Sequence, residues 1–160
     1  MWVLAIGAHP EDLEYGCAGT LIKHAQHGDD VFMMIITDGS AGGEPDVRSA
    51  EQLDAAKVIG AKDVFFGGYL YTKFECHRES IMKIEEIVRQ VEPNTVYTHF
   101  GEDMHQDHRH IARAVVPAAR SVQNLLFFEG WSSQQFPPTV FVDISSVIDQ
   151  KLAALEAHAS

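Results

Sequence analysis

Apolar residues in this chain gather in short runs that are separated by amphipathic stretches. Six runs are strand candidates, and they cover residues 2–7, 31–37, 63–67, 94–99, 125–129 and 139–144. The first run, WVLAIG, is continuously apolar, as expected of a strand that is buried on both faces of a parallel sheet.

Helices are predicted between these strands, over residues 14–27, 47–60, 78–91 and 107–120 and from Ser145 or Ser146 onward. The clearest is 78–91, whose apolar residues recur at spacings of three and four and form one stripe. Pro117 is expected to kink or shorten the helix that contains it. No repeat, low-complexity tract or linker divides the chain, so residues 1–160 are expected to form a single domain.

The alternation of strands and helices predicts a three-layer, Rossmann-like α/β domain with a mostly parallel sheet. In such folds, ligands bind beyond the carboxyl ends of the strands. Three polar segments, 9–12, 38–43 and 99–108, each follow a predicted strand. We therefore expect these segments to meet on one rim of the sheet.

Charge and composition narrow the classes of partner. The chain has 12 Lys and Arg against 23 Asp and Glu, a formal net charge of −11, which disfavours nucleic acid and anionic membrane surfaces. No stretch approaches the roughly 18 apolar residues of a membrane span, and the N-terminus lacks the features of a signal peptide. Cys17 and Cys76 form no CxxC pair. We expect a cytoplasmic enzyme or binding domain.

The first chemical candidate is the turn that follows the first strand, His9-Pro10-Glu11-Asp12. Imidazole and carboxylate together suit a divalent transition metal, and His9 and Asp12 can face one point across a tight turn. Glu11 is then free for another role. The alternative is that these acids only cap the following helix, which is the more common arrangement when such a turn is considered alone.

The second candidate is HFGEDMHQDHRH, residues 99–110, which holds four histidines and three acids. A ligating or catalytic histidine usually donates its second N–H to a carboxylate, and Asp103 and Asp107 are available for this. The alternative is a solvated polar loop with incidental histidines. His99, at a strand end, is expected to be a half-buried structural residue, and His158 a surface or helix-end residue.

These two clusters resemble the motifs of the PIG-L/LmbE-type family of zinc-dependent N-acetylglucosaminyl deacetylases. AHPED and GCAGT are similar to the family's AHPDD and GxGGT, and DMHQDHR is similar to its DxHxDHR. TDGSAGG, Arg48-x-x-Glu51, FFE and FVDIS match further landmarks, so that the resemblance spans essentially the whole chain.

The resemblance implies an LmbE-like fold and roles for individual residues. His9, Asp12 and His108 would bind Zn²⁺, or Fe²⁺ or another divalent transition metal in its place. Glu11 would be the general base, with His105 and its neighbour Asp107 completing the catalytic group. Arg48, Asp103 and Tyr71 are expected to contact the substrate.

The implied reaction is the removal of an acetyl group from an N-acetylated amino sugar or sugar conjugate, a linear amide. Glu11 would take the proton of the attacking water. His105, held by Asp107 or Asp103, would stabilise the oxyanion or protonate the leaving amine. The expected partner is thus a small molecule, with no nucleic acid or membrane insertion, and a homo-oligomer is possible.

Three departures from the family pattern leave alternatives open. The usual base is Asp, and Glu11 is one methylene longer, which moves the carboxylate by about 1.5 Å, and a ~1 Å misplacement can cost about a hundredfold in rate. Tyr71 stands near the place of an Asp that contacts the sugar, and the chain is expected to lack the C-terminal part that is usual in the family. The alternatives are hydrolysis of another acyl group, such as an O-acetyl ester or a thiol-conjugate amide, and a catalytically weak metal- or sugar-binding module.

Overall fold

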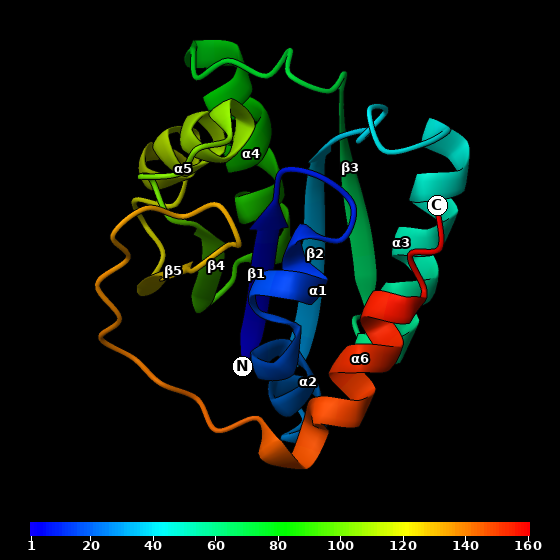
Figure 1. The fold of residues 1–160 in the computed structure, drawn as a ribbon. Helices are drawn as coiled ribbons and strands as arrows, with labels where there is room; N and C mark the ends of the chain where they lie inside the picture. Colours follow the sequence, from blue (N-terminus) through cyan, green and yellow to red (C-terminus); the bar gives the residue numbers. More distant parts are fainter.

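Five parallel strands form one sheet in the computed structural model, which describes residues 1–160 (Figure 1). The strands are β1 Trp2–Gly7, β2 Asp30–Thr37, β3 Asp63–Tyr69, β4 Thr95–His99 and β5 Asn124–Phe128. Their order is β3-β2-β1-β4-β5, and every neighbouring pair is parallel. This order places β1 at the centre, where the direction of strand succession reverses, which is the point where open α/β sheets bind ligands.

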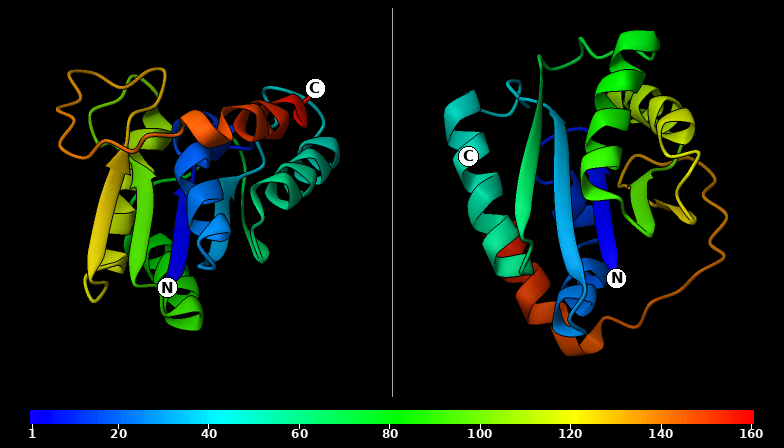
Figure 2. Two further views of the ribbon diagram at one scale, coloured as in Figure 1. Left: turned by 90° about the horizontal axis from the view of Figure 1, so that it is seen from below. Right: turned by 180° about the vertical axis from the view of Figure 1, so that it is seen from behind.

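Helices cover both faces of the sheet, which confirms the predicted three-layer fold (Figure 2). They are α1 Asp12–Gly16, α2 Ala18–Gln26, α3 Pro45–Ile59, α4 Arg78–Val91, α5 Gln106–Ala118 and α6 Ile148–Glu156, with the short 3₁₀ helix η1 Ser145–Val147 before α6. The helices α4 and α5 pack on one face, and α1, α2, α3 and α6 on the other. No helix combines the length and the apolar composition that crossing a bilayer requires.

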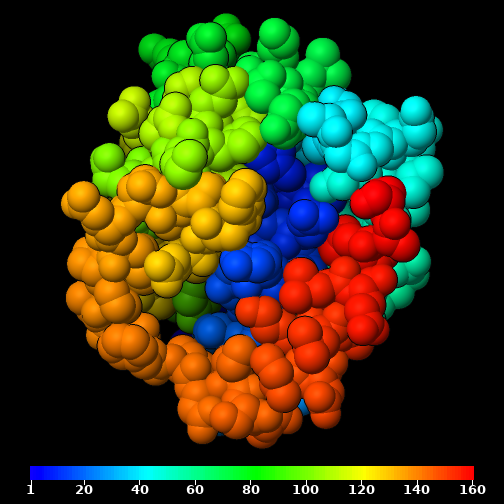
Figure 3. All heavy atoms as spheres, in the orientation of Figure 1, coloured from blue at the N-terminus to red at the C-terminus, as the bar shows by residue number.

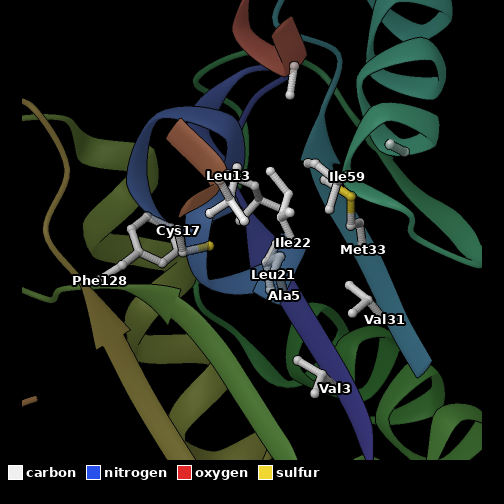
Figure 4. Close-up of a cluster of buried hydrophobic side chains, with 14 of the residues drawn as sticks. Val3, Ala5, Leu13, Cys17, Leu21, Ile22, Val31, Met33, Ile59 and Phe128 are labelled. Carbon is white, nitrogen blue, oxygen red and sulfur yellow. The ribbon is translucent and has the colours of Figure 1, made fainter. Parts of the chain in front are cut away.

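The central strand divides the core in two. Val3 and Ala5 point into one apolar cluster, which is shown in Figure 4, and Leu4 and Ile6 point into the other. All four side chains are fully buried, as the continuous apolar run predicts. Burying a branched aliphatic side chain contributes roughly 1.5–3 kcal/mol, so β1 is a rigid base for the turn that follows it.

The helix predicted over 14–27 is interrupted at Cys17 and forms α1 and α2. The glycines on either side, Gly16 and Gly19, allow close packing of these helices. A Cβ on Gly16 would lie 2.4 Å from the ring of Phe128, and one on Gly19 would lie 2.7 Å from Ile144.

The prediction of a strand at 139–144 is wrong, because these residues pair with no strand. Val140 and Phe141 are 61% and 80% exposed, although a run of β-branched and aromatic residues is typical of a strand. Pro137 and Pro138, which precede the segment, have no N–H to donate to a β-ladder. Pro117 lies in the last turn of α5, which ends at Ala118, two residues before the predicted end.

Candidate functional site

The three polar segments meet at the carboxyl end of the sheet, as predicted. They surround a pocket of about 270 Å³, whose wall includes His9, Glu11, Asp12, Arg48, Tyr71, His105, His108 and Trp131. Figure 3 shows the N-terminal region, in blue, at the base of a hollow between segments from other parts of the chain.

Asp12 is the hub of the pocket. Its Oδ2 atom lies 3.1 Å from Nδ1 of His9, 3.4 Å from Nε2 of His108 and 3.3 Å from Nε2 of His99. The same oxygen accepts a 2.8 Å hydrogen bond from the backbone N–H of His9. Burial disfavours the charged carboxylate, but the surrounding imidazoles hold the pKa of Asp12 well below its ordinary value. The structure therefore brings His9 and His108 together around the carboxylate of Asp12.

Two further carboxylates face the opposite nitrogens of these histidines. Asp107 Oδ2 is hydrogen-bonded to Nε2 of His9 at 3.0 Å, and Asp103 Oδ1 lies 3.1 Å from Nδ1 of His108. Burial lowers the pKa of His9, but the carboxylates of Asp107 and Asp12 outweigh this and raise it to about 9. Carboxylate–histidine pairs of this kind orient the ligands of metal sites.

The donor set fits a divalent transition metal. Nε2 of His108 is buried and has no hydrogen-bond partner, although it faces the Asp12 carboxylate. A buried nitrogen without a partner is costly unless another group satisfies it. Ligand atoms of His9, His105 and His108 lie within 4.8 Å of one another, as do those of Asp12, His99 and His108. Nitrogen and carboxylate donors at such separations suit zinc or iron.

His99 lies closer to this cluster than the sequence indicated. It is fully buried, not half-buried, and its ring stacks on that of His108 with centroids 4.0 Å apart. Its Nε2 accepts a 3.0 Å hydrogen bond from the N–H of Ala8, so this nitrogen is already engaged by the backbone. The only sign of this in the sequence was the position of His99 at the end of β4. The carboxyl ends of all the parallel strands lie at this rim.

His105 is oriented differently from the expectation. The carboxylate of Asp107 is hydrogen-bonded to Nε2 of His9 and accepts the N–H of Thr72. Asp107 contacts the ring of His105 only through its backbone N–H, which donates to Nδ1 at 3.1 Å. Asp103 likewise accepts the backbone N–H of His105 and does not touch its ring. The expectation that one of these carboxylates holds the ring of His105 is therefore wrong.

The partner of the His105 ring is Tyr71, whose Oη lies 2.8 Å from Nε2. Because Nδ1 of His105 accepts the N–H of Asp107, the neutral ring carries its proton on Nε2 and donates it to Tyr71. Burial lowers the pKa of His105, which favours this neutral form. Tyr71, expected to contact the substrate, thus also holds His105.

Glu11 lies at the pocket mouth with its side chain 53% exposed. Its backbone is left-handed (φ 82°), which a non-glycine residue adopts only where its surroundings hold it. Arg48, which is buried, donates to the carbonyl of Pro10 at 3.0 Å, and its Nη2 lies 3.8 Å from Oε2 of Glu11. Arg48 therefore fixes the turn that carries the acid.

The glycine-rich loop after β2 packs around the same arginine. A Cβ on Gly42 would lie 2.5 Å from Nη1 of Arg48, and one on Gly39 would lie 2.8 Å from its Nε. With a larger residue at either position, the guanidinium would have to move away from its present place against the loop.

Two residues beneath Glu11 were missed from the sequence. Gln52 accepts a 3.3 Å hydrogen bond from the N–H of Glu11 and donates one of 2.6 Å to Oε1 of Glu14. Both side chains are fully buried. The other oxygen of Glu14 lies 3.6 Å from Nε2 of His158. Of the two expected places for His158, a surface or a helix end, the second is right, because its buried side chain follows the end of α6. Helical Gln and Glu residues are usually exposed, so the sequence carried no signal for this network.

The chain is similar to several known proteins. The family model described as PIG-L: GlcNAc-PI de-N-acetylase matches residues 4–119. The chain is 32% identical to "Uncharacterized deacetylase YaiS" of Escherichia coli K12, over 99% of this chain and 90% of that protein. It is 29% identical to diacetylchitobiose deacetylase of Thermococcus kodakarensis, over 99% of this chain and 69% of that protein.

The crystal structure of the conserved protein TT1542 from Thermus thermophilus superposes with a TM-score of 0.90 at 27% identity, covering 97% of this chain and 77% of that one. The fold, the two motifs and the matched residues agree with one another. The chain therefore belongs to the PIG-L family of de-N-acetylases.

Proposed function

We propose that the protein is a metal-dependent hydrolase that removes the acetyl group from an N-acetylated amino sugar or sugar conjugate. The observation that carries the proposal is the Asp12 carboxylate, which lies within 3.4 Å of both His9 and His108 beside Glu11 in one pocket. Two relatives are named deacetylases, and one of these names includes diacetylchitobiose. These names support an acetyl group as the group removed and an amino sugar as the substrate.

His9, Asp12 and His108 would hold the metal, with Zn²⁺ as the first choice and Fe²⁺ as the second. A divalent ion in such a site lowers the pKa of water and polarises the acyl carbonyl. Asp107 and Asp103 keep the two histidines oriented by facing their other nitrogens. This assigns Asp103 to the support of His108, while its predicted contact with substrate stays a prediction.

Glu11 is the general base of the proposed reaction. Its carboxylate takes a proton from the water that attacks the acetamide carbonyl carbon. The C–N bond then breaks, the proton passes to the amine nitrogen, and acetate and a free amino sugar leave. The exposure of Glu11 at the pocket mouth gives the longer side chain room to swing toward the reacting atoms.

His105 and Tyr71 stabilise the charge that develops on the carbonyl oxygen. The neutral His105 ring donates its Nε2–H to the Tyr71 oxygen, which leaves the hydroxyl hydrogen of Tyr71 to donate to the carbonyl oxygen. One such donor typically contributes about 3–4 kcal/mol to catalysis. Arg48 would bind a hydroxyl or anionic group of the substrate at the mouth of the pocket, beside Glu11.

The test is turnover by the purified protein after treatment with chelator and reloading with Zn²⁺. We expect release of acetate and free amine from an N-acetylglucosamine derivative, and loss of this activity on chelation. A parallel panel of O-acetyl esters and thiol-conjugate amides distinguishes hydrolysis of another acyl group. Sugar affinity without turnover of any of these substrates would contradict the proposal and favour a binding module.

A further inference from the structure

We propose that Trp131 is the platform on which the sugar ring of the substrate packs. The inference rests on the proposed function and specifies how the same pocket would recognise an N-acetyl hexosamine. Trp131 lines the pocket together with His9, His105 and Arg48, and yet 73% of its surface is exposed. An indole in this position has a large apolar face that packing within the chain does not cover.

The turn that carries Trp131 is fixed. Ser133 donates its N–H to the carbonyl of Gly130 at 3.2 Å, and its Oγ accepts the N–H of Gly130 at 2.9 Å, so Trp131 is at the corner of a closed turn. The N–H of Met104 donates to the carbonyl of Ser132 at 3.0 Å. A side chain on a fixed turn loses little conformational freedom when a ligand binds to it.

The same turn is connected through Asp103 to His108, one of the proposed metal ligands. Ser132 and Ser133 donate their hydroxyls to Oδ1 and Oδ2 of Asp103, at 2.6 and 3.1 Å. Oδ1 of Asp103 also lies 3.1 Å from Nδ1 of His108. One buried carboxylate therefore positions both a histidine at the base of the pocket and the turn that bears the indole at its rim.

Trp131 is the large apolar surface that the pocket wall offers to a sugar ring. The other large aromatic ring is Tyr71, which is turned edge-on to His105 and accepts the Nε2–H of His105 with its hydroxyl oxygen. Most of the remaining wall is polar or charged. A pyranose has a face of C–H groups and a rim of hydroxyls, so its C–H face fits the indole while the acetamide group and hydroxyls reach the polar wall.

The experiment uses the fluorescence of Trp131. The chain has two tryptophans, and Trp2 lies at the start of β1, at the opposite end of the strand from the pocket. In the Trp2→Phe protein, loaded with zinc, methyl N-acetyl-β-glucosaminide should change the emission saturably. The Trp131→Phe protein, which keeps Trp2, should show no saturable change.

Kinetics provide a second readout. Trp131→Ala should raise KM about tenfold with kcat changed less than about twofold, and Trp131→Phe should recover most of the loss. The matched control is Phe141→Ala, which removes another exposed aromatic side chain that does not line the pocket, and it should leave both constants unchanged.

The outcomes separate this inference from the proposed function. Turnover of the sugar with no change in Trp131 emission would overturn the inference and leave the deacetylase standing. A saturable emission change without turnover would support the platform and contradict the deacetylase. Neither emission change nor turnover would overturn both.

Discussion

Gln52 and Glu14 form a fully buried pair in which the amide of Gln52 donates a 2.6 Å hydrogen bond to the carboxylate of Glu14. The oxygen of the same amide accepts the N–H of Glu11, the proposed base. A single side chain therefore joins a buried acid to the left-handed backbone of the turn that carries the proposed base.

Replacement of Gln52 by Leu should destabilise the protein by about 1–3 kcal/mol, because it leaves the Glu14 carboxylate and the Glu11 N–H without their partner. It should also lower kcat while metal content stays constant, since the ligands are not touched. Urea unfolding, metal analysis and kinetics measure the three effects. Gln26→Leu, at an exposed glutamine of α2, is the control and should change stability by less than about 0.5 kcal/mol. Equal stability of the two variants would show that the network does not hold the turn.

Replacement of Glu11 by Gln should lower kcat about 10²- to 10⁴-fold, the range that a general base contributes, and leave metal binding intact. The side chain keeps its size but can no longer take a proton. Glu11→Asp restores the carboxylate at the length usual in the family and should recover activity. Loss of metal from Glu11→Gln would instead identify Glu11 as a ligand.

Replacement of Asp103 by Asn should weaken metal affinity about 10- to 100-fold, because the carboxylate that faces Nδ1 of His108 is lost. Competition with a chelator of known affinity measures this change. Asp143→Asn removes an exposed carboxylate that caps Ser145 and should bind metal like the unmodified protein. Unchanged metal affinity in Asp103→Asn would show that Asp103 holds only the turn that carries Trp131 and does not support His108 as a ligand.

The metal-free protein should lose stability as the pH rises through about 9. Folding raises the pKa of His9 from 6.5 to about 9, so the charged ring stabilises the fold below pH 6.5 and this contribution disappears above pH 9. The size of the effect is at most about 3 kcal/mol. It is measured as the difference in urea unfolding between the chelator-treated protein and its His9→Gln variant, at pH 6 and pH 10. The same proton competes with metal, so metal affinity should rise over this pH range. A difference that does not depend on pH would contradict the assignment.

The residues at the rim of the site could be predicted from the sequence, but the buried residues that hold them could not. His9, Asp12 and His108 could be placed together because the ends of parallel strands share one edge of the sheet, whatever the details of packing. Gln52 and Glu14 could not be found, because their burial depends on how α3 packs against α1. The strand expected at 139–144 did not form for a similar reason, since an apolar run forms a strand only when a partner strand is available. The orientation of the His105 ring depends on the positions of the Tyr71 hydroxyl and the Asp107 N–H in the folded chain. Tyr71 comes from a loop whose position could not be predicted from the sequence.

We expect His9, Asp12 and His108 to hold one metal ion at the base of the pocket. Crystals of the zinc-loaded protein, measured at the zinc absorption edge, test it most directly. We expect one anomalous peak per chain within bonding distance of these three side chains, about 2.0–2.2 Å from the imidazole nitrogens and the carboxylate oxygen. A peak bound by other residues and not by Asp12, or no peak in the pocket at all, would contradict it.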